Sequence, residues 1–176
     1  MAIHPNKPLV YAVHEVGRVE GRPAGAVAAY RPRARGELEL RVVRPTEGPV
    51  PCHLAVDPKG RWLVVANYAD GSVTVFPLDG DGHPGPRLQR IQHEGRGPNE
   101  RRQQGPHAHG VTFDLGGDWC WVPDLGADRV FGYRVSETGL VAAPSATAAP
   151  PPGSGPRHFE IHPNGRWAYS VNELTS

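Results

Sequence analysis

Short apolar runs separated by turn residues dominate the chain, and four pairs of these runs align with one another. The aligned pairs cover residues 2–15, 55–68, 112–125 and 160–173. In each pair, a turn such as DPKG or HPNG joins a short apolar strand to a second strand rich in Trp, Val or Tyr. We predict that the four first strands end at Ile3, Val56, Phe113 and Ile161. The pattern predicts an all-β protein built from a repeated unit.

Further apolar runs follow the aligned pairs and extend each repeat. Third strands are predicted within residues 24–31, 69–82 and 126–139, after a loop over residues 16–23 in the first unit. A fourth strand is predicted at residues 87–94, with weaker patterns at 37–44 and 139–147. Four strands with a period of roughly 40–50 residues are typical of a β-propeller blade. A β-sandwich is the alternative, but sandwich strands do not repeat their sequence at a fixed period.

The repeat divides the chain into one partial propeller domain of about three and a half blades. The units lie near residues 1–50, 51–105, 106–153 and 154–176, and the last one stops before its third strand. Propellers need about 4–8 blades to close a ring. Open sheet edges promote association, so we expect either a fragment of a longer protein, which we favour, or self-association through those edges.

Composition excludes several classes of partner. Lys and Arg number 19 against 18 Asp and Glu, and a net charge of +1 argues against nucleic acid or an anionic membrane as the main partner. Cys52 and Cys120 are too few for a disulfide framework, and no apolar run reaches the roughly 18 residues of a membrane span. The first residues lack the features of a signal peptide. We therefore predict a cytoplasmic protein.

Polar residues with useful chemistry stand next to the predicted inner strands. In a propeller blade, the loop that precedes the first strand and the loop that follows the second lie on the same face. The residues expected to converge there are His53, His107, His109, Arg157, His158, Glu15 and Glu173. Imidazole, guanidinium and carboxylate groups on one rim can hold an anion and activate a water molecule.

Several of these residues also have structural interpretations. His53 and His158 recur at one blade position, so a hydrogen bond to a neighbouring blade explains them equally well. His107 and His109 alternate along a strand, so only one faces the channel, and we favour His109. A pair between Arg157 and Glu173 is compatible with either role.

Three further observations concern the polar loop and bound groups. Most of the charges at Arg96, Arg101 and Arg102 are expected to be solvated, with Arg102 retained as a candidate for substrate binding. The HAH triplet lacks a clear third metal ligand, and no Gly-rich phosphate loop is present. We expect no metal and no cofactor.

Three stretches together carry a resemblance to a known family. They are PCHLAVDPKGRWLVVANY, GPHAH and GPRHFEIHPNGRWAYSVNEL. The chain closely resembles the propeller-type lactonases, which include bacterial 6-phosphogluconolactonases. Nearly the whole chain is covered, and the resemblance implies a seven-bladed propeller with its site at the channel mouth. Small departures are His14 in place of the usual Asn and DLGGDW in place of a DPxGR turn.

The resemblance also implies site residues and a reaction. It implies His109 (or His107), Arg157 and Glu173 as catalytic residues, and a later Arg without a counterpart before Ser176. Together with the rim argument, we expect His53, His107, Arg102 and His158 to bind substrate.

The reaction implied is hydrolysis of 6-phospho-D-glucono-1,5-lactone to 6-phosphogluconate in the pentose phosphate pathway. Glu173 or His109 would be the base, and Arg157 would hold the phosphate or the oxyanion. The alternatives are a carboxymuconate-type lactonising or lactone-hydrolysing enzyme, a non-catalytic binding scaffold and an inactive fragment.

Overall fold

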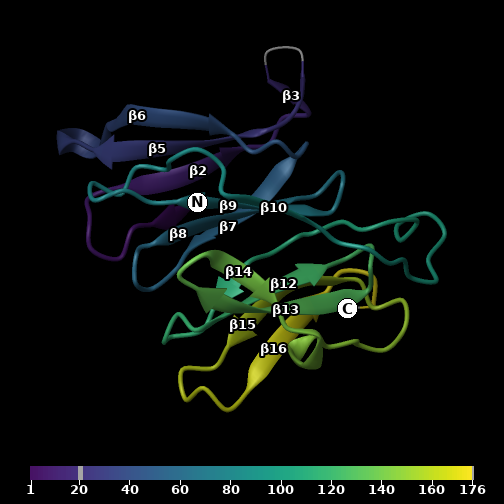
Figure 1. The fold of residues 1–176 in the computed structure, drawn as a ribbon. Coiled ribbons are helices and arrows are strands. Elements are labelled where there is room, and N and C mark those ends of the chain that lie inside the picture. The colour runs from purple at the N-terminus through teal and green to yellow at the C-terminus, as the bar shows by residue number, and fades with distance from the viewer. Residues whose placement is uncertain (20–21, 176) are drawn as a thin grey trace.

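The computed structural model describes residues 1–19 and 22–175, and within them the chain forms four main antiparallel sheets. The sheets follow one another in chain order, from purple to yellow in Figure 1. Sheet one contains β1 (Ala2–Ile3), β2 (Val10–His14), β5 (Ala26–Pro32) and β6 (Leu38–Pro45); sheet two contains β7 (Pro51–Val56), β8 (Trp62–Asn67), β9 (Ser72–Pro77) and β10 (Gln89–Gln92); sheet three contains β11 (Thr112–Phe113), β12 (Trp119–Asp124), β13 (Arg129–Ser136) and β14 (Gly139–Ala142); sheet four contains β15 (Pro156–Ile161) and β16 (Ala168–Asn172). Successive strands pair in each main sheet, as in propeller blades, so the all-β fold of propeller type is confirmed.

The strand ends follow the sequence pattern closely. The first strands β1, β7, β11 and β15 end at the four predicted residues. The predicted third strands are present as β5, β9 and β13, and the predicted fourth strands as β10, β6 and β14. The division of the chain into units at residues 50, 105 and 153 stays a prediction.

Two predicted segments differ from the structure. The strand expected over 139–147 ends at Ala142, because Pro144 opens the 3₁₀ turn η2 (Pro144–Ala146) and cannot donate to a strand ladder. The loop expected over 16–23 holds a short hairpin of β3 (Arg18–Val19) and β4 (Arg22–Pro23). The middle of that predicted loop, residues 20–21, lies outside the described residues.

Aspartate side chains close the turns between first and second strands. Asp57 Oδ1 accepts the backbone N–H groups of Arg61 at 2.5 Å and Trp62 at 2.9 Å. In sheet three, Asp114 Oδ1 accepts the corresponding N–H groups of Asp118 and Trp119. Each of these turns includes a glycine with a positive φ, at positions 60 and 117. The recurring Asp therefore fixes the turn that the Pro and Gly pattern predicted.

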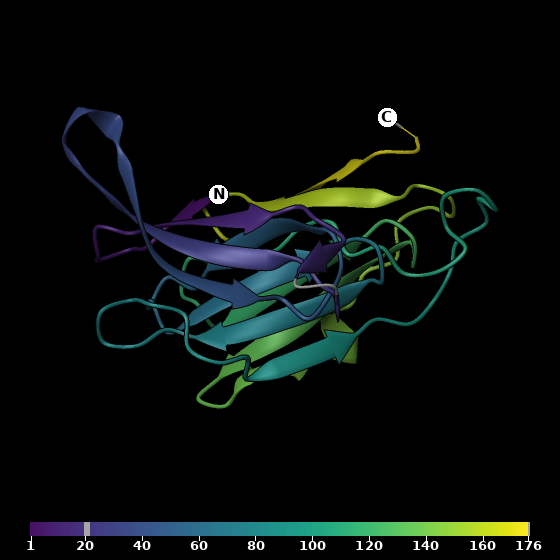
Figure 2. The same cartoon turned by 90° about the horizontal axis from the view of Figure 1, so that it is seen from above.

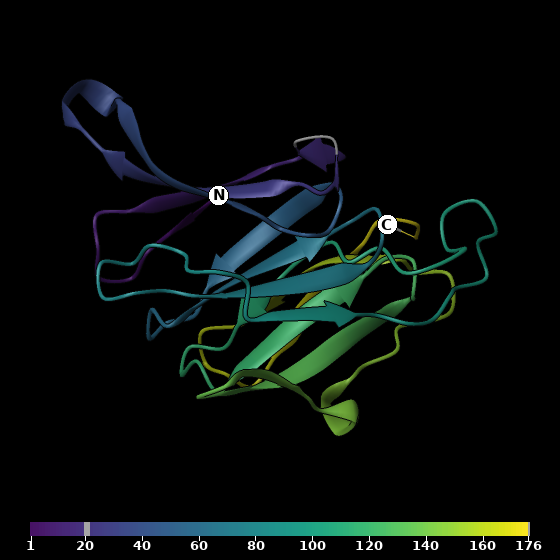
Figure 3. The same ribbon diagram turned by 45° about the horizontal axis from the view of Figure 1, so that its top comes forward.

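The main sheets pack face to face, which Figure 3 shows as successive layers. Every residue of β8 is buried, because each of its faces meets a neighbouring sheet. Leu63 and Val65 pack against Tyr11 of sheet one. The alternating residues pack against sheet three in a cluster formed by Trp62, Val64, Ala66, Val111, Val122 and others. Burial of both faces explains why β8 is an almost continuous apolar run.

The fourth sheet repeats this pattern with one face uncovered. Trp167, Tyr169 and Val171 stand where Trp62, Val64 and Ala66 stand in sheet two, and they are 63%, 58% and 57% exposed. Figure 2 shows sheet four, in yellow-green, at the edge of the array. The repeat thus places an apolar face on sheet four that no described residue covers.

Helical structure is confined to short turns in the described chain. The strands β5 and β6 meet at the 3₁₀ turn η1 (Ala34–Gly36), and this hairpin projects from the array in Figures 2 and 3. No helix in residues 1–19 and 22–175 has the length and apolar character to cross a membrane.

The repeat predicts different stability costs for two equivalent tryptophans. Trp62 is 8% exposed and donates from Nε1 to the Ser136 carbonyl at 3.2 Å, whereas Trp167 is 63% exposed. We expect Trp62→Ala to lower the free energy of unfolding by about 3–5 kcal/mol. Trp167→Ala should change it by about 0.5 kcal/mol or less. Urea unfolding followed by circular dichroism measures both, and equal losses would contradict the packing described above.

Candidate functional site

The expected convergence of rim residues is visible at the ends of the second strands. Pairing places Pro51 beside Asn67, and Pro156 beside Asn172, while an isolated bridge joins Ala108 to Asp124. The segments that precede the first strands therefore meet the residues that end the second strands. This arrangement brings three imidazole rings together: the centroid of the His158 ring lies 5.5 Å from that of His53 and 5.8 Å from that of His109.

Glu173 is the centre of the ion pairs at this rim. Its Oε1 accepts from Arg102 Nη2 at 2.5 Å, and its Oε2 accepts from Arg157 Nη1 at 2.8 Å. His109 Nε2 lies 3.8 Å from the same Oε2. We call these four residues the Glu173 cluster. It draws on four chain segments: the loop before residue 105, the HAH segment, the start of β15 and the residue after β16, the last two at one end of sheet four.

The two guanidinium groups determine the charge of Glu173. Partial burial alone would raise its pKa, but the Arg102 hydrogen bond and the charges of Arg102, Arg157 and His109 outweigh burial. The pKa of Glu173 is therefore below its ordinary value. A carboxylate that is ionised and paired on both oxygens is a weak proton acceptor.

His109 is held in the neutral form. Burial lowers its pKa, and the nearby charge of Arg157 lowers it further, while Glu173 acts in the opposite direction. The resulting pKa is below the ordinary imidazole value of 6.5. At neutral pH, His109 therefore has a ring nitrogen free to accept a proton.

His107 makes a different set of contacts. Its ring stacks on Tyr68, with centroids 4.6 Å apart and an interplanar angle of 16°, and its Nδ1 lies 2.9 Å from the Tyr68 carbonyl oxygen. Tyr68 also presents its ring to His109 at 5.3 Å, and its hydroxyl lies 3.4 Å from Arg102 Nη2. Tyr68 and His107 thus form an aromatic wall beside the Glu173 cluster.

Tyr68 was missing from the residues that the sequence suggested. It follows β8 at the position occupied by Glu173 after β16 and by Glu15 after β2. That shared position was the available signal, although an aromatic residue there does not by itself indicate a polar site. Glu15, which was expected at the rim, is exposed and is not one of the cluster residues.

His53 takes part in a bond between sheets. Its Nδ1 accepts the backbone N–H of Val111 at 3.2 Å, which is the structural role considered for it. Burial, followed by the charges of His158, the N-terminus and His109, lowers its pKa to about 4. His53 therefore stays neutral beside the cluster and can offer Nε2 to a ligand.

A folded loop carries Arg102 to the cluster. Asn99 Oδ1 accepts the N–H groups of Arg101 and Arg102, both at 3.1 Å. Gln103, which is 1% exposed, accepts from the Asn99 N–H and donates to the Leu125 carbonyl at 2.9 Å. The loop is thus tied to the end of β12, so Arg102 differs from a freely solvated surface charge.

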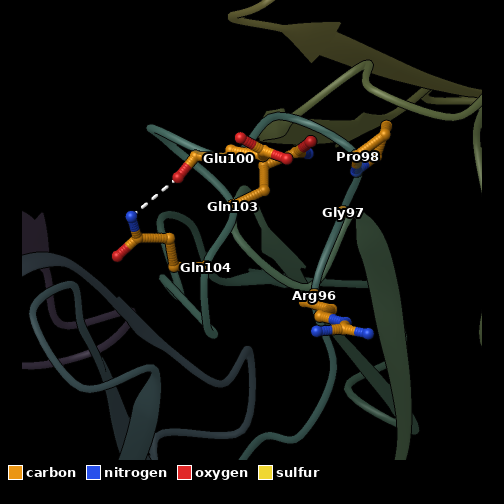
Figure 4. A pocket seen from close by; sticks show the side chains of 6 residues that line it. All are labelled: Arg96, Gly97, Pro98, Glu100, Gln103 and Gln104. Carbon is orange, nitrogen blue, oxygen red and sulfur yellow. Dashed lines mark hydrogen bonds between the residues drawn. The ribbon is translucent and has the colours of Figure 1, made fainter.

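A cavity of about 540 Å³ lies on the same loop (Figure 4). Its lining consists of Arg96, Gly97, Pro98, Glu100, Gln103 and Gln104. Gln104 Nε2 donates to the Glu100 carbonyl at 2.7 Å, shown as the dashed line. The lining of this cavity includes no imidazole and no residue of the Glu173 cluster. We therefore take the cluster, which combines imidazole, guanidinium and carboxylate groups, as the candidate site.

Within residues 1–19 and 22–175, no group of three or more His, Cys, Asp or Glu side chains is placed to hold a metal ion.

Comparison with known families and sequences gives a consistent result. A family model described as "Lactonase, 7-bladed beta-propeller" matches residues 1–176. The 6-phosphogluconolactonase of Bacillus subtilis (strain 168) is 34% identical over 177 residues, which cover 100% of this chain and 48% of that protein. The 6-phosphogluconolactonase of Pectobacterium atrosepticum is 35% identical over 178 residues, with coverages of 100% and 48%. The chain spans about half the length of the curated relatives it matches.

Solved structures give the same fold. The periplasmic gluconolactonase of Pseudomonas aeruginosa is 36% identical with a TM-score of 0.90, over 99% of this chain and 50% of that one. A putative 6-phosphogluconolactonase of Bacteroides fragilis is 32% identical with a TM-score of 0.86, over 94% and 48% of the two chains.

The charges around His109 predict opposite effects of two substitutions. Glu173→Gln removes a negative charge that raises the pKa of His109, so that pKa should fall further. Arg157→Gln removes a positive charge that lowers the pKa, so it should rise. Titration of the His109 ring protons by NMR measures both directions. Shifts of the same sign in the two variants would contradict the cluster geometry.

Proposed function

The chain belongs to the lactonase family of seven-bladed β-propellers, and on that premise we propose that the Glu173 cluster is part of a lactone-hydrolysing site. The observation that carries the proposal is a neutral His109 beside a carboxylate held by two guanidinium groups. Opening a lactone requires a base for the attacking water and a positive group for the oxyanion. Both are present within one cluster.

His109 is the better candidate for the base. Glu173 is ionised, but its lowered pKa and its two ion pairs make it a weak base. The Nδ1 of His109 lies 3.9 Å from the Cys52 sulfur, which leaves Nε2 as the nitrogen that faces Glu173. When Nε2 accepts a proton, Glu173 stabilises the imidazolium that forms. Glu173 therefore assists His109.

The two arginines differ in their distance from the base. Arg157 and His109 share the Oε2 atom of Glu173, whereas Arg102 binds Oε1 on the other side. We assign Arg157 to the oxyanion that develops on the carbonyl oxygen, because it is next to the base. Arg102, beside the Tyr68 hydroxyl, is assigned to the distal phosphate of the substrate.

The reaction then proceeds in two steps. His109 accepts a proton from water as the water oxygen bonds to the lactone carbonyl carbon, and the carbonyl oxygen becomes negative. The oxyanion collapses, the bond to the ring oxygen breaks, and the imidazolium returns the proton to that oxygen. The product is an open-chain hydroxy acid, which is 6-phosphogluconate when the substrate is 6-phospho-D-glucono-1,5-lactone. All of these steps use groups of the protein and one water molecule.

An unphosphorylated lactone is the second candidate substrate. The solved relative from Pseudomonas aeruginosa, 36% identical, is described as a gluconolactonase. The two substrates differ by the phosphate assigned to Arg102, so a variant that lacks the Arg102 guanidinium distinguishes them.

Hydrolysis rates of both lactones test the proposal. Freshly prepared 6-phosphogluconolactone and glucono-1,5-lactone are compared with the spontaneous rate at the same pH. We expect turnover above that rate, and His109→Gln should reduce kcat by about 10²–10⁴-fold. Arg102→Ala should raise KM for the phosphorylated lactone and leave that for the other unchanged.

Arg101→Ala is the matched control, because Arg101 is an exposed neighbour in the same loop. It should leave both rates unchanged. Turnover that survives His109→Gln at the wild-type rate would reject His109 as the base. No turnover of either lactone by the unmodified chain would reject the function for this chain and favour a binding or inactive role.

Location and self-association stay predictions. The free thiols Cys52 and Cys120 are compatible with a cytoplasmic protein, although the relative from Pseudomonas aeruginosa is described as periplasmic. The uncovered apolar face of sheet four is compatible with association through the open sheet edges.

A further inference from the structure

A buried chain of polar side chains connects β13 of sheet three to the end of β12 at the rim. His93 Nδ1 lies 2.7 Å from Asp124 Oδ2, and His93 Nε2 lies 2.8 Å from the Tyr133 hydroxyl. All three residues are at most 3% exposed, and the His93 ring stacks on Phe131 at 3.9 Å. We call His93, Asp124 and Tyr133 the buried triad. Polar groups that are so completely buried destabilise the fold unless they form hydrogen bonds, and each of these three side chains does.

Hydrogen bonds link the three side chains through the His93 ring. Burial raises the pKa of Tyr133, so its hydroxyl stays protonated, and it bonds to His93 Nε2. His93 Nδ1 bonds to Oδ2 of Asp124 on the other side of the ring. Tyr133 and Asp124 therefore hold the His93 ring between them.

The Asp124 carboxylate also bonds to the backbone of the HAH segment. Its Oδ1 accepts the backbone N–H of His107 at 2.7 Å and that of Ala127 at 2.8 Å. The His107 carbonyl accepts the Leu125 N–H at 3.0 Å, and the His109 N–H donates to Pro123. The backbone of the HAH segment is therefore held by residues 123–125.

The equivalent position in the other sheets lacks this arrangement. Asn67 ends β8 at the position of Asp124, and its Nδ2 bonds to Ser72 and Thr74 within its own sheet. Asn172 stands there in sheet four. A carboxylate occurs in the sheet whose first strand follows two histidines, and its partner His93 comes from sheet two. In sheet one the equivalent residue is His14, which bonds to the Tyr30 hydroxyl at 3.1 Å, so within the described residues the carboxylate at this position occurs in sheet three alone.

We propose that the buried triad is a positioning device that holds His107 and His109 in place against Tyr68 and Glu173. Within the triad, Asp124 acts directly on the segment, while His93 and Tyr133 act by fixing the carboxylate of Asp124. The expected effect of the triad on catalysis rests on the proposed function, whereas its effect on the backbone of the HAH segment does not.

The test is a pair of tyrosine variants, each of which removes one buried hydroxyl group. Tyr133→Phe removes the hydroxyl that bonds to His93 Nε2 and leaves every residue of the Glu173 cluster unchanged. Tyr11→Phe is the control, since Tyr11 is also buried and donates one bond, to the Gly82 carbonyl at 2.5 Å. Tyr11 lies in sheet one, outside the triad. His93→Gln is a second variant that removes the ring but keeps hydrogen-bonding capacity.

Amide hydrogen exchange gives the structural readout. Relative to core amides of β8, exchange of the His107 and Ala127 amides should rise about fivefold in Tyr133→Phe, as expected for loss of one hydrogen bond, and further in His93→Gln. Tyr11→Phe should leave both amides unchanged relative to the same reference. Unchanged His107 exchange in both triad variants would overturn the proposal.

Lactone hydrolysis gives the second readout. In an active chain, Tyr133→Phe should lower kcat about fivefold with KM unchanged, and Tyr11→Phe should leave kcat unchanged. Equal loss in the two variants, or no loss in Tyr133→Phe, would overturn the role of the triad in catalysis. If the unmodified chain shows no turnover, the proposed function fails for this chain, and amide exchange still decides whether the triad positions the segment.

Discussion

Burial of both faces of the central strands is the constraint on which the rest of the structure depends. Each of β8 and β12 lies between two sheets: β8 packs against sheets one and three, and β12 packs against sheet two and, through Trp121 and Phe159, against sheet four. Antiparallel pairing inside a sheet puts the start of its first strand next to the end of its second strand, and stacking brings these ends together from neighbouring sheets. Apolar packing in the interior therefore determines where the polar rim residues meet.

The charges at the rim then give Glu173 and His109 different protonation states and different roles. Glu173 receives a guanidinium group on each oxygen, which keeps it ionised and occupied. Burial and Arg157 keep His109 neutral and available. The same residues in water would have more similar roles, because solvent would screen the charges that separate them. The sheets supply the partly dry environment in which a base and its supporting carboxylate become distinct.

Much of the fold was predictable because its signals are local. Apolar alternation and the turns between first and second strands place the ends of the four first strands to the residue, and Pro144 was a readable reason for the early end of β14. The contacts of Tyr68 and His93 were not predictable, since both act on residues of a neighbouring sheet. Arg102 was a candidate within a charged loop, but its pairing with Glu173 depends on how Asn99 and Gln103 fold that loop.

The most direct test of the account is the pH dependence of kcat/KM for lactone hydrolysis, corrected for the spontaneous rate. A base with a pKa below the ordinary imidazole value of 6.5 predicts a constant rate at neutral pH and a decline of slope one on acidification below that value. Arg157→Gln should move the midpoint of any residual activity to higher pH. The account would be contradicted by a profile with no ionisation in the imidazole range, or by one that His109→Gln leaves unchanged.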